Sequence, residues 1–329
     1  MSSHHRTVLV HTGIDDSVYF LNHADHGSKS QAPVVHCMLN SNINKDLITR
    51  ACGFELIDSS NGLICLTNSL NRLCFLNPAT RVCREVICPK RIFLYGTYSC
   101  LRAFGYSITN DEYKFLYVST IREHITAHVY TLRSNDDLHN WKELRVDKAL
   151  IPHNGGFRDI GSIINEKAHW TIHREQPYRH GFSILAFDFT NETFNEVSPP
   201  QLCGGRQDNG LLTDFFIAGV NQNLSVCHKV WRSNGCYVEV WMMMRYGVSE
   251  SWSKIYNFEL GQNTTVKEII MPCAITSEEE ALFFLVSHRK VLLVKDLNVR
   301  QPSYVQVFDN YNISSVLRHV NSLVSPFLC

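Results

Sequence analysis

A near-regular repeat restricts the fold of this chain more than any other feature of its sequence. Pairs of short apolar runs, separated by short polar loops, recur along the 329 residues, and such pairs are typical of β-hairpins. One anchor position in the second run of each pair repeats at separations of 55, 54, 57, 54 and 54 residues. The anchors are Leu21, Leu76, Tyr130, Phe187, Trp241 and Lys295. A constant period of this length indicates a repeat architecture.

Further apolar stretches complete each repeat. One follows every pair and, from the second pair onward, another precedes it, so that a repeat holds four strands. The pattern predicts an all-β fold: a six-bladed, kelch-like β-propeller in which residues 1–329 form a single domain. The first repeat lacks its innermost strand, and the apolar segment from Ser315 to Phe327 is expected to fill that place and close the ring. Two β-sandwich domains are the alternative, which the uniform period and the lack of a linker disfavour.

An ordered series of short motifs resembles the plant F-box-associated domain family across nearly the whole chain from about Arg6. The motifs are NGLICL from Asn61, LNPATR from Leu76, FGY from Phe104, NDEYK from Asn110, INEKAHW from Ile164, FDF from Phe187, ETF from Glu192, VWMM from Val240, YGVSESWSK from Tyr246 and SLVSP from Ser322. The resemblance implies a propeller that recruits protein substrates to an SCF-type ubiquitin ligase. It also implies an N-terminal F-box of helices that binds the adaptor of the ligase.

The beginning of the sequence departs from that family. An F-box should show a Leu-Pro start and an amphipathic helical pattern, but the first strand pair begins at Arg6. We therefore expect the F-box to be absent, either because the sequence is a fragment or because the protein is a natural paralogue without one. The ligase adaptor would then bind only if an F-box lies upstream. The alternative function is an interaction protein that acts as a scaffold or competitor.

Charge and hydropathy exclude several classes of partner. Lys and Arg number 31 and Asp and Glu number 31, so no global basic field favours nucleic acid. No apolar run reaches the roughly 18 residues that span a bilayer, and no signal segment precedes Arg6. We expect no nucleic-acid or membrane partner, reduced cysteines, and a location in the cytoplasm, the nucleus or both.

Catalytic motifs are missing from the sequence. It has no Gly-x-Ser-x-Gly elbow, His-Glu-x-x-His helix, phosphate loop or Cys-x-x-Cys pair. The buried polar candidates, His169 and Asp188, are interpreted as structural groups, with Asp188 a hydrogen-bond acceptor that ties strands together. We therefore predict a binding module with no catalytic residue, no metal and no cofactor, and a propeller enzyme remains the weaker alternative.

The loops carry the sharper functional signal. Loops between second and third strands have an excess of about four positive charges, whereas loops at the opposite face reach about minus six. A basic face with aromatic residues suits an acidic or phosphorylated protein, because Arg forms bidentate contacts with carboxylate or phosphate. The predicted substrate-binding residues are Arg72, Arg122, Arg174, Tyr178, Arg179, Trp231, Arg232 and Arg289.

Overall fold

The computed structural model consists of β-strands joined by turns and loops, with one short 3-10 helix, Ser249–Ser251, in the described part of the chain. The described residues are 6–12, 18–22, 55–67, 72–80, 82–89, 99–121, 124–133, 140–151, 158–176, 179–201, 215–220, 222–232, 235–260, 270–275, 280–285, 290–295, 303–306, 313–320 and 322–327. The all-β prediction is confirmed.

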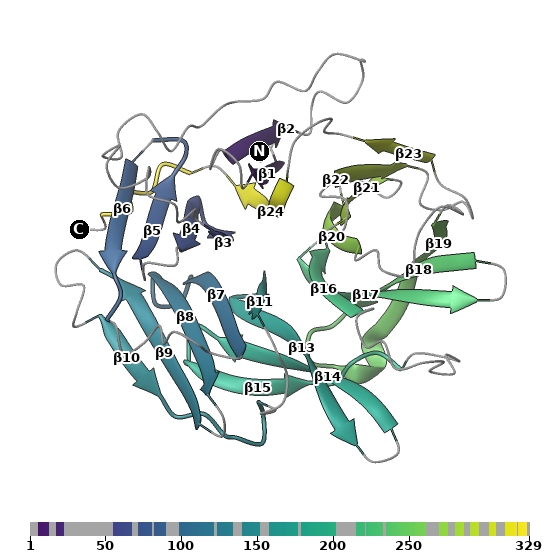
Figure 1. Cartoon of the computed structure of the whole chain (residues 1–329), viewed down its shortest axis with the longest axis horizontal. Helices are drawn as coiled ribbons and strands as arrows, with labels where there is room; N and C mark the ends of the chain where they lie inside the picture. Colours follow the sequence, from purple (N-terminus) through teal and green to yellow (C-terminus); the bar gives the residue numbers. More distant parts are fainter. Residues whose placement is uncertain are drawn as a thin grey trace. The chain divides into compact units, whose positions relative to one another are not determined.

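Within these residues the strands form six sheets (Figure 1). Sheet one has the order β2-β1-β24. Sheets two, four, five and six each contain four strands in chain order, and sheet three contains four consecutive strands and one addition. The bounds in sheets one to three are β1 (Arg6–Thr12), β2 (Val18–Asn22), β24 (Ile313–Val320), β3 (Glu55–Ser60), β4 (Leu63–Thr67), β5 (Arg72–Asn77), β6 (Val82–Ile87), β7 (Ser99–Ser107), β8 (Glu112–Ile121), β9 (His124–Leu132), β10 (Trp141–Leu144) and β11 (Arg158–Ile160). Those in sheets four to six are β12 (Ser162–Ile164), β13 (Lys167–Gln176), β14 (Arg179–Asp188), β15 (Thr193–Val197), β16 (Phe215–Val220), β17 (Asn223–Arg232), β18 (Gly235–Met243), β19 (Trp252–Leu260), β20 (Ile270–Ile275), β21 (Glu280–Leu285), β22 (Lys290–Lys295) and β23 (Ser303–Gln306).

All six predicted strand pairs are present and neighbour each other in their sheets. They are β1 with β2, β4 with β5, β8 with β9, β13 with β14, β17 with β18, and β21 with β22. Several of these strands are near-continuous apolar runs because both of their faces are buried, as in β4, in which all five residues are buried. The third stretch assigned to the first repeat, which begins at Pro33, lies outside the described residues.

One strand differs from the expected pattern. The stretch expected to open the fourth repeat, Ile160–Asn165, is shared between two sheets. Ile160 ends β11, which pairs in parallel with Cys100–Arg102 of β7, and Ser162–Ile164 begins sheet four. Gly161 lies between the two pieces, and its N–H donates to the Arg102 carbonyl at 2.7 Å. Sheet three thereby gains a fifth strand at its inner edge.

The C-terminal strand pairs with the first strand of the chain. β24 runs antiparallel to β1, with Leu317 opposite Leu9. The strand ends at Val320, earlier than the expected Phe327, and residues of the tail beyond it accept hydrogen bonds from sheet two through their backbone carbonyls instead. The Asn77 side chain donates to the carbonyls of Ser322, at 3.0 Å, and Val324.

The strands divide between two compact units. Unit one comprises Met1–Ala168, Phe187–Phe194 and Ile313–Cys329, and unit two comprises His169–Ala186 and Asn195–Asn312. Sheet four contributes residues to both. In unit one, β24 contacts β3 and β3 contacts β7; in unit two, β16 contacts β20. The first strands of successive sheets are therefore neighbours within each unit, with β24 in the corresponding place of sheet one.

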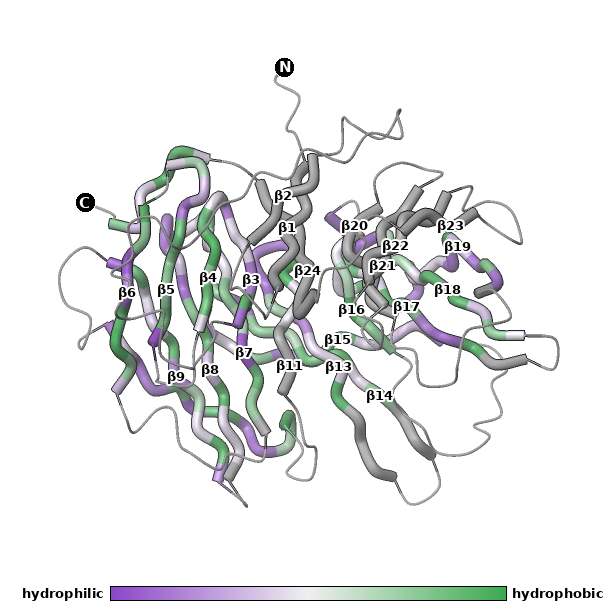
Figure 2. The backbone as a smooth tube through the Cα atoms, turned by 45° about the horizontal axis from the view of Figure 1, so that its top comes forward, coloured by the Kyte–Doolittle hydropathy of each residue, from purple (hydrophilic) through white to green (hydrophobic). Residues whose placement is uncertain are grey.

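A cluster of buried apolar residues lies between sheets two and three in unit one. Phe75 of β5 stacks on Tyr130 of β9 at a centroid distance of 5.8 Å and contacts Phe104 of β7 at 5.4 Å. All three rings are fully buried. Figure 2 shows the apolar stretches of β4 and β8 that contribute to this packing. Facing aromatic rings of this kind stabilise a sheet interface through both buried area and ring geometry.

Candidate protein-binding surface

The connections between strands define two ends of each four-stranded sheet. We call the end where the second strand joins the third, as β4 joins β5 and β17 joins β18, the hairpin end. The opposite end, where the first strand joins the second and the third joins the fourth, is the turn end. The hairpin end is where the sequence places the substrate-binding residues.

The structure places five of the eight predicted residues on strands beside these hairpins. Arg72 is the first residue of β5, Arg174 lies near the end of β13, Arg179 is the first residue of β14, and Trp231 and Arg232 end β17. Of these five, only Arg72 has a described side chain. Arg122, Tyr178 and Arg289 lie outside the described residues altogether. Their gathering into one basic surface stays a prediction.

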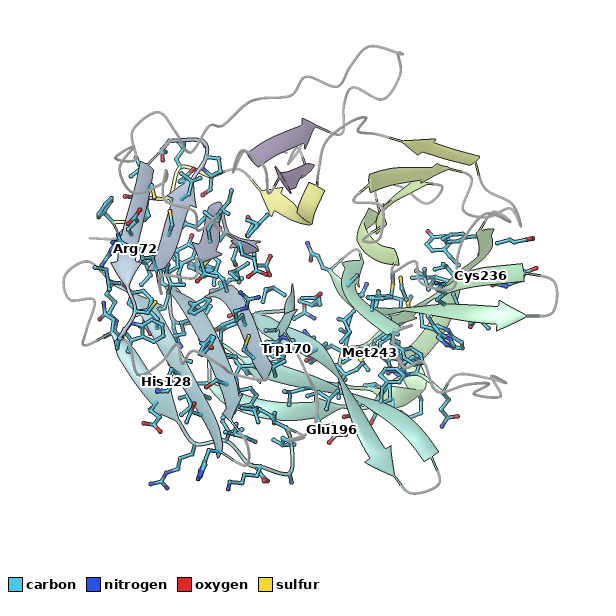
Figure 3. The ribbon with its side chains drawn as sticks, in the orientation of Figure 1. Arg72, His128, Trp170, Glu196, Cys236 and Met243 are labelled. Atoms are coloured by element: carbon cyan, nitrogen blue, oxygen red, sulfur yellow. The ribbon has the colours of Figure 1, made fainter. Side chains whose placement is uncertain are left out.

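Arg72, which Figure 3 labels, already has an anionic partner within its own sheet. Its Nη1 atom lies 2.9 Å from Oε2 of Glu85 on β6, and the two side chains are 26% and 20% exposed. A substrate carboxylate would have to compete with Glu85 for this guanidinium.

An aromatic stack that the sequence reasoning missed lies close to the hairpin end in unit two. Phe182 of β14 stacks on Phe215 of β16 at 4.2 Å, and Phe215 stacks on His228 of β17 at 4.5 Å. Burial lowers the pKa of His228 to about 4, although Glu239 acts in the opposite direction. The ring is therefore neutral at physiological pH. The sequence pattern of one strand can predict which of its residues share a face. It cannot predict that Phe182 of one sheet stacks on Phe215 of the next sheet.

A second missed feature is an ion pair between first strands in unit one. Arg102 of β7 contacts Glu55 of β3 through two hydrogen bonds, of 2.6 and 3.0 Å. Arg102 is 7% exposed, whereas the Glu55 side chain is 54% exposed. Glu55 opens β3 at the hairpin end of sheet two, and its carboxylate is partly open to solvent there. Because Arg102 pairs with it, the two residues together add no net charge to that end.

At the turn end, two acidic residues contribute less negative charge than a count of the sequence assigns to them. Glu112 does not act as a free anion, because Lys114 and Arg133 lie 3.1 and 2.7 Å from its carboxylate. Burial raises the pKa of Asp58 to about 8, against a hydrogen bond from the Ser59 N–H, so this carboxyl is largely protonated at pH 7. The sequence count at this end includes Asp58, Asp111, Glu112, Glu166, Glu278, Glu279 and Glu280. Asp58 and Glu112 therefore add little net charge to it. The others counted include Glu278 and Glu279, which lie outside the described residues.

Asp188 and His169 have the structural surroundings that the sequence analysis assigned to them. Asp188 accepts hydrogen bonds from the N–H groups of Thr190 and Asn191 and pairs with Lys167. His169 Nε2 lies 2.8 Å from the Tyr246 hydroxyl, inside unit two. Both polar groups are engaged by the protein itself.

The described residues contain neither a metal-binding cluster nor a membrane-spanning helix. No group of three or more His, Cys, Asp or Glu side chains in that part of the chain is arranged to hold a metal ion. No helix found there is long and apolar enough to cross a membrane.

Comparison with known proteins identifies the repeat. The family described as the F-box associated beta propeller domain matches residues 17–329. F-box protein At3g07870 of Arabidopsis thaliana is 27% identical over 228 residues, covering 62% of this chain and 51% of the relative. F-box protein CPR1 of the same plant is 24% identical over 299 residues, covering 82% and 68%. F-box protein At4g22390 is 23% identical over 281 residues, covering 75% and 63%. The chain thus spans between about half and two thirds of the length of these relatives.

Proposed function

Because the chain belongs to the F-box associated β-propeller family, we propose that it is a binding module that presents protein substrates to an SCF-type ubiquitin ligase. The match over residues 17–329 is the observation that carries this proposal. The relatives are named F-box proteins, and their greater length leaves room for a ligase-docking segment outside the matched region. The module itself performs no chemistry, and its place of action is the cytoplasm, the nucleus or both.

We further propose that the six sheets are the six blades of a ring that β24 closes. The near-constant repeat supports six equivalent units. The pairing of β24 with β1, its contact with β3, and the hydrogen bonds of Asn77 to the tail support a C-terminal fastening. Ring closure protects edge strands that would otherwise be open to pairing with other chains.

The substrate meets the hairpin end in this proposal. Arginines on separate hairpins can bind carboxylates or phosphates in a bidentate manner, and Tyr178 and Trp231 supply anchoring area. An acidic or phosphorylated segment of a protein is the expected ligand. The ligase adaptor would bind through an F-box upstream of the propeller and not through the propeller.

A capture experiment with two matched triple variants tests the binding surface. Arg122→Glu, Arg179→Glu and Arg289→Glu reverse three hairpin charges, and Glu278→Lys, Glu279→Lys and Glu280→Lys reverse three at the turn end. Proteins captured by the immobilised chain from plant extract should be lost with the arginine variant, by about tenfold in affinity, and kept with the glutamate variant. Phosphatase treatment and higher salt should weaken capture, and both variants should melt like the parent.

The opposite outcome of the capture experiment would assign partner binding to the other end of the sheets. If the glutamate variant loses its partners while the arginine variant keeps them, the turn end is the binding surface. If captured partners are never ubiquitinated when an F-box is supplied, the chain acts as a scaffold or competitor instead.

A further inference from the structure

Two cysteines contact each other across neighbouring strands of sheet two. The Sγ atoms of Cys74 on β5 and Cys83 on β6 lie 2.7 Å apart. In the antiparallel register Cys74 is opposite Glu85, and Cys83 is opposite Leu76. The two cysteines are therefore diagonal neighbours on the same face of the sheet, a relation from which side chains can touch.

The same diagonal repeats one step along the strands. Arg72 is opposite Ile87, yet its guanidinium reaches Glu85, two residues earlier on β6, at 2.9 Å. The two contacts have the same direction and lie on the same face. The register of β5 against β6 thus places two diagonal pairs within contact distance on this face.

The two thiols differ in their surroundings. Cys74 is 1% exposed, whereas Cys83, on the outer strand, is partly exposed. The hydrogen bond with Cys83, and then burial, raise the pKa of the Cys74 thiol well above its usual value. Cys83 is consequently the thiol that a dissolved oxidant meets first, and Cys74 is held in place as its partner.

We propose that Cys74 and Cys83 form a disulfide-forming site that a peroxide closes. The Cys83 thiolate attacks one peroxide oxygen, the O–O bond breaks, and hydroxide leaves, so that Cys83 becomes a sulfenic acid. The Cys74 sulfur then attacks the Cys83 sulfur, and the sulfenic oxygen leaves as water with the thiol proton. Two thiols and one hydrogen peroxide give one disulfide and two waters. The product fastens β6 to β5.

Peptide mapping tests the site in the full chain. Trypsin releases Leu73–Arg81 and Val82–Arg84, which each contain a single cysteine, so a bond between Cys74 and Cys83 joins two unique peptides. After treatment with hydrogen peroxide, and alkylation of remaining thiols in denaturant, mass spectrometry should find these two peptides linked. Dithiothreitol should separate them, and the oxidised protein should melt several degrees above the reduced protein.

The variant Cys83→Ser serves as the control. It should show neither the linked peptides nor the shift in melting temperature, and peroxide should consume two thiols fewer than in the parent. The proposal is overturned if Cys74 and Cys83 of the peroxide-treated parent remain fully alkylated, or if they are found linked to other cysteines. A parent whose melting temperature does not change with the linked peptides present would show that the bond forms but does not fasten β6.

Discussion

Asn77 and Asp188 occupy equivalent positions in two repeats but bind different partners. Each is the last residue of the third strand of its sheet, β5 or β14, and both lie in unit one. Asn77 Oδ1 accepts from the N–H groups of Ala79 and Thr80 at 2.8 and 3.3 Å. Asp188 Oδ1 accepts from Thr190 and Asn191 at 2.9 and 3.1 Å. The turn is thus the same in both repeats.

The two sites differ in what the second polar atom of each side chain binds. The Asn77 amide nitrogen donates to two carbonyls of the C-terminal tail, whereas the second Asp188 oxygen binds Lys167. An amide offers both a donor and an acceptor, and a carboxylate offers only acceptors. The repeat therefore sets the turn, and the side chain determines whether the turn holds a neighbouring backbone or a cation.

The largest effect should come from Asn77→Asp, which makes the first site resemble the second. The turn acceptor is kept, but a carboxylate would face two carbonyl oxygens at a fully buried position. We expect a loss of about 3 kcal/mol or more in the free energy of unfolding, because a buried charge is left without a partner. Urea denaturation at pH 7 measures it. A loss below that of Asp188→Asn would show that Asn77 does not hold the tail.

Gly62→Ala should have the next largest effect. Gly62 has φ of +88°, and an added Cβ would lie 1.9 Å from Ser322 Oγ, so the tail would have to move. We expect a loss of about 2 kcal/mol. Gly247→Ala is the matched control, because Gly247 has φ of +80° and a Cβ added there would meet nothing within 4 Å. Equal losses in the two variants would mean that only the backbone angle matters and that the tail does not press on this turn.

Asp188→Asn should cost less, about 1 kcal/mol at pH 7, because the turn survives and the Lys167 partner is partly exposed. Burial acts to raise the pKa of Asp188, but hydrogen bonds from Lys167 and Asn191 outweigh it and lower the pKa below its usual value. The stabilisation is therefore present above the ordinary pKa, about 4, and is lost as the pH falls through the lowered value. Melting curves at pH 7 and at about pH 2.5, well below the ordinary pKa, should show the gap between parent and variant narrowing in acid. A gap that widens would contradict the ion pair.

Ser322→Ala should have the smallest effect, about 0.5 kcal/mol. The Ser322 hydroxyl donates to the Asn61 carbonyl at 3.1 Å from a partly exposed position, and water can replace it. Thermal melts of the variant alone and combined with Asn77→Asp measure the coupling between the two contacts. Strict additivity would mean that they hold the tail independently.

The strand pairs could be predicted from sequence because paired apolar runs and the polar turns between them are local signals. The turns at Asn77 and Asp188 are local as well, since the acceptor and its donors lie within three residues. The partners of the second polar atoms are not, because Ser322 and Val324 lie far from Asn77 in the chain. For the same reason the pattern could not assign Arg158–Ile160 to the sheet of β7.

Two acidic residues carry less free charge than the loop count assigns to them. Counting acidic residues assigns Glu112 and Asp58 one negative charge each. The fold places Lys114 and Arg133 against Glu112 and buries Asp58 enough to raise its pKa to about 8. At the hairpin end the count could identify Arg72 as a cation, but not its pairing with Glu85. The composition of a loop predicts its net charge only where no oppositely charged side chain on a neighbouring strand pairs with it.

A reconstituted ubiquitination reaction tests the central claim most directly. The chain, joined to an F-box segment from a relative such as F-box protein CPR1, would be combined with the ligase components and a partner from the capture experiment. We predict ubiquitin chains on the partner, and a loss of about tenfold in rate at limiting partner concentration when Arg122, Arg179 and Arg289 are changed to Glu. The matched variant with Glu278, Glu279 and Glu280 changed to Lys should keep the parent rate. An unmodified partner, or equal rates in both variants, would contradict the account.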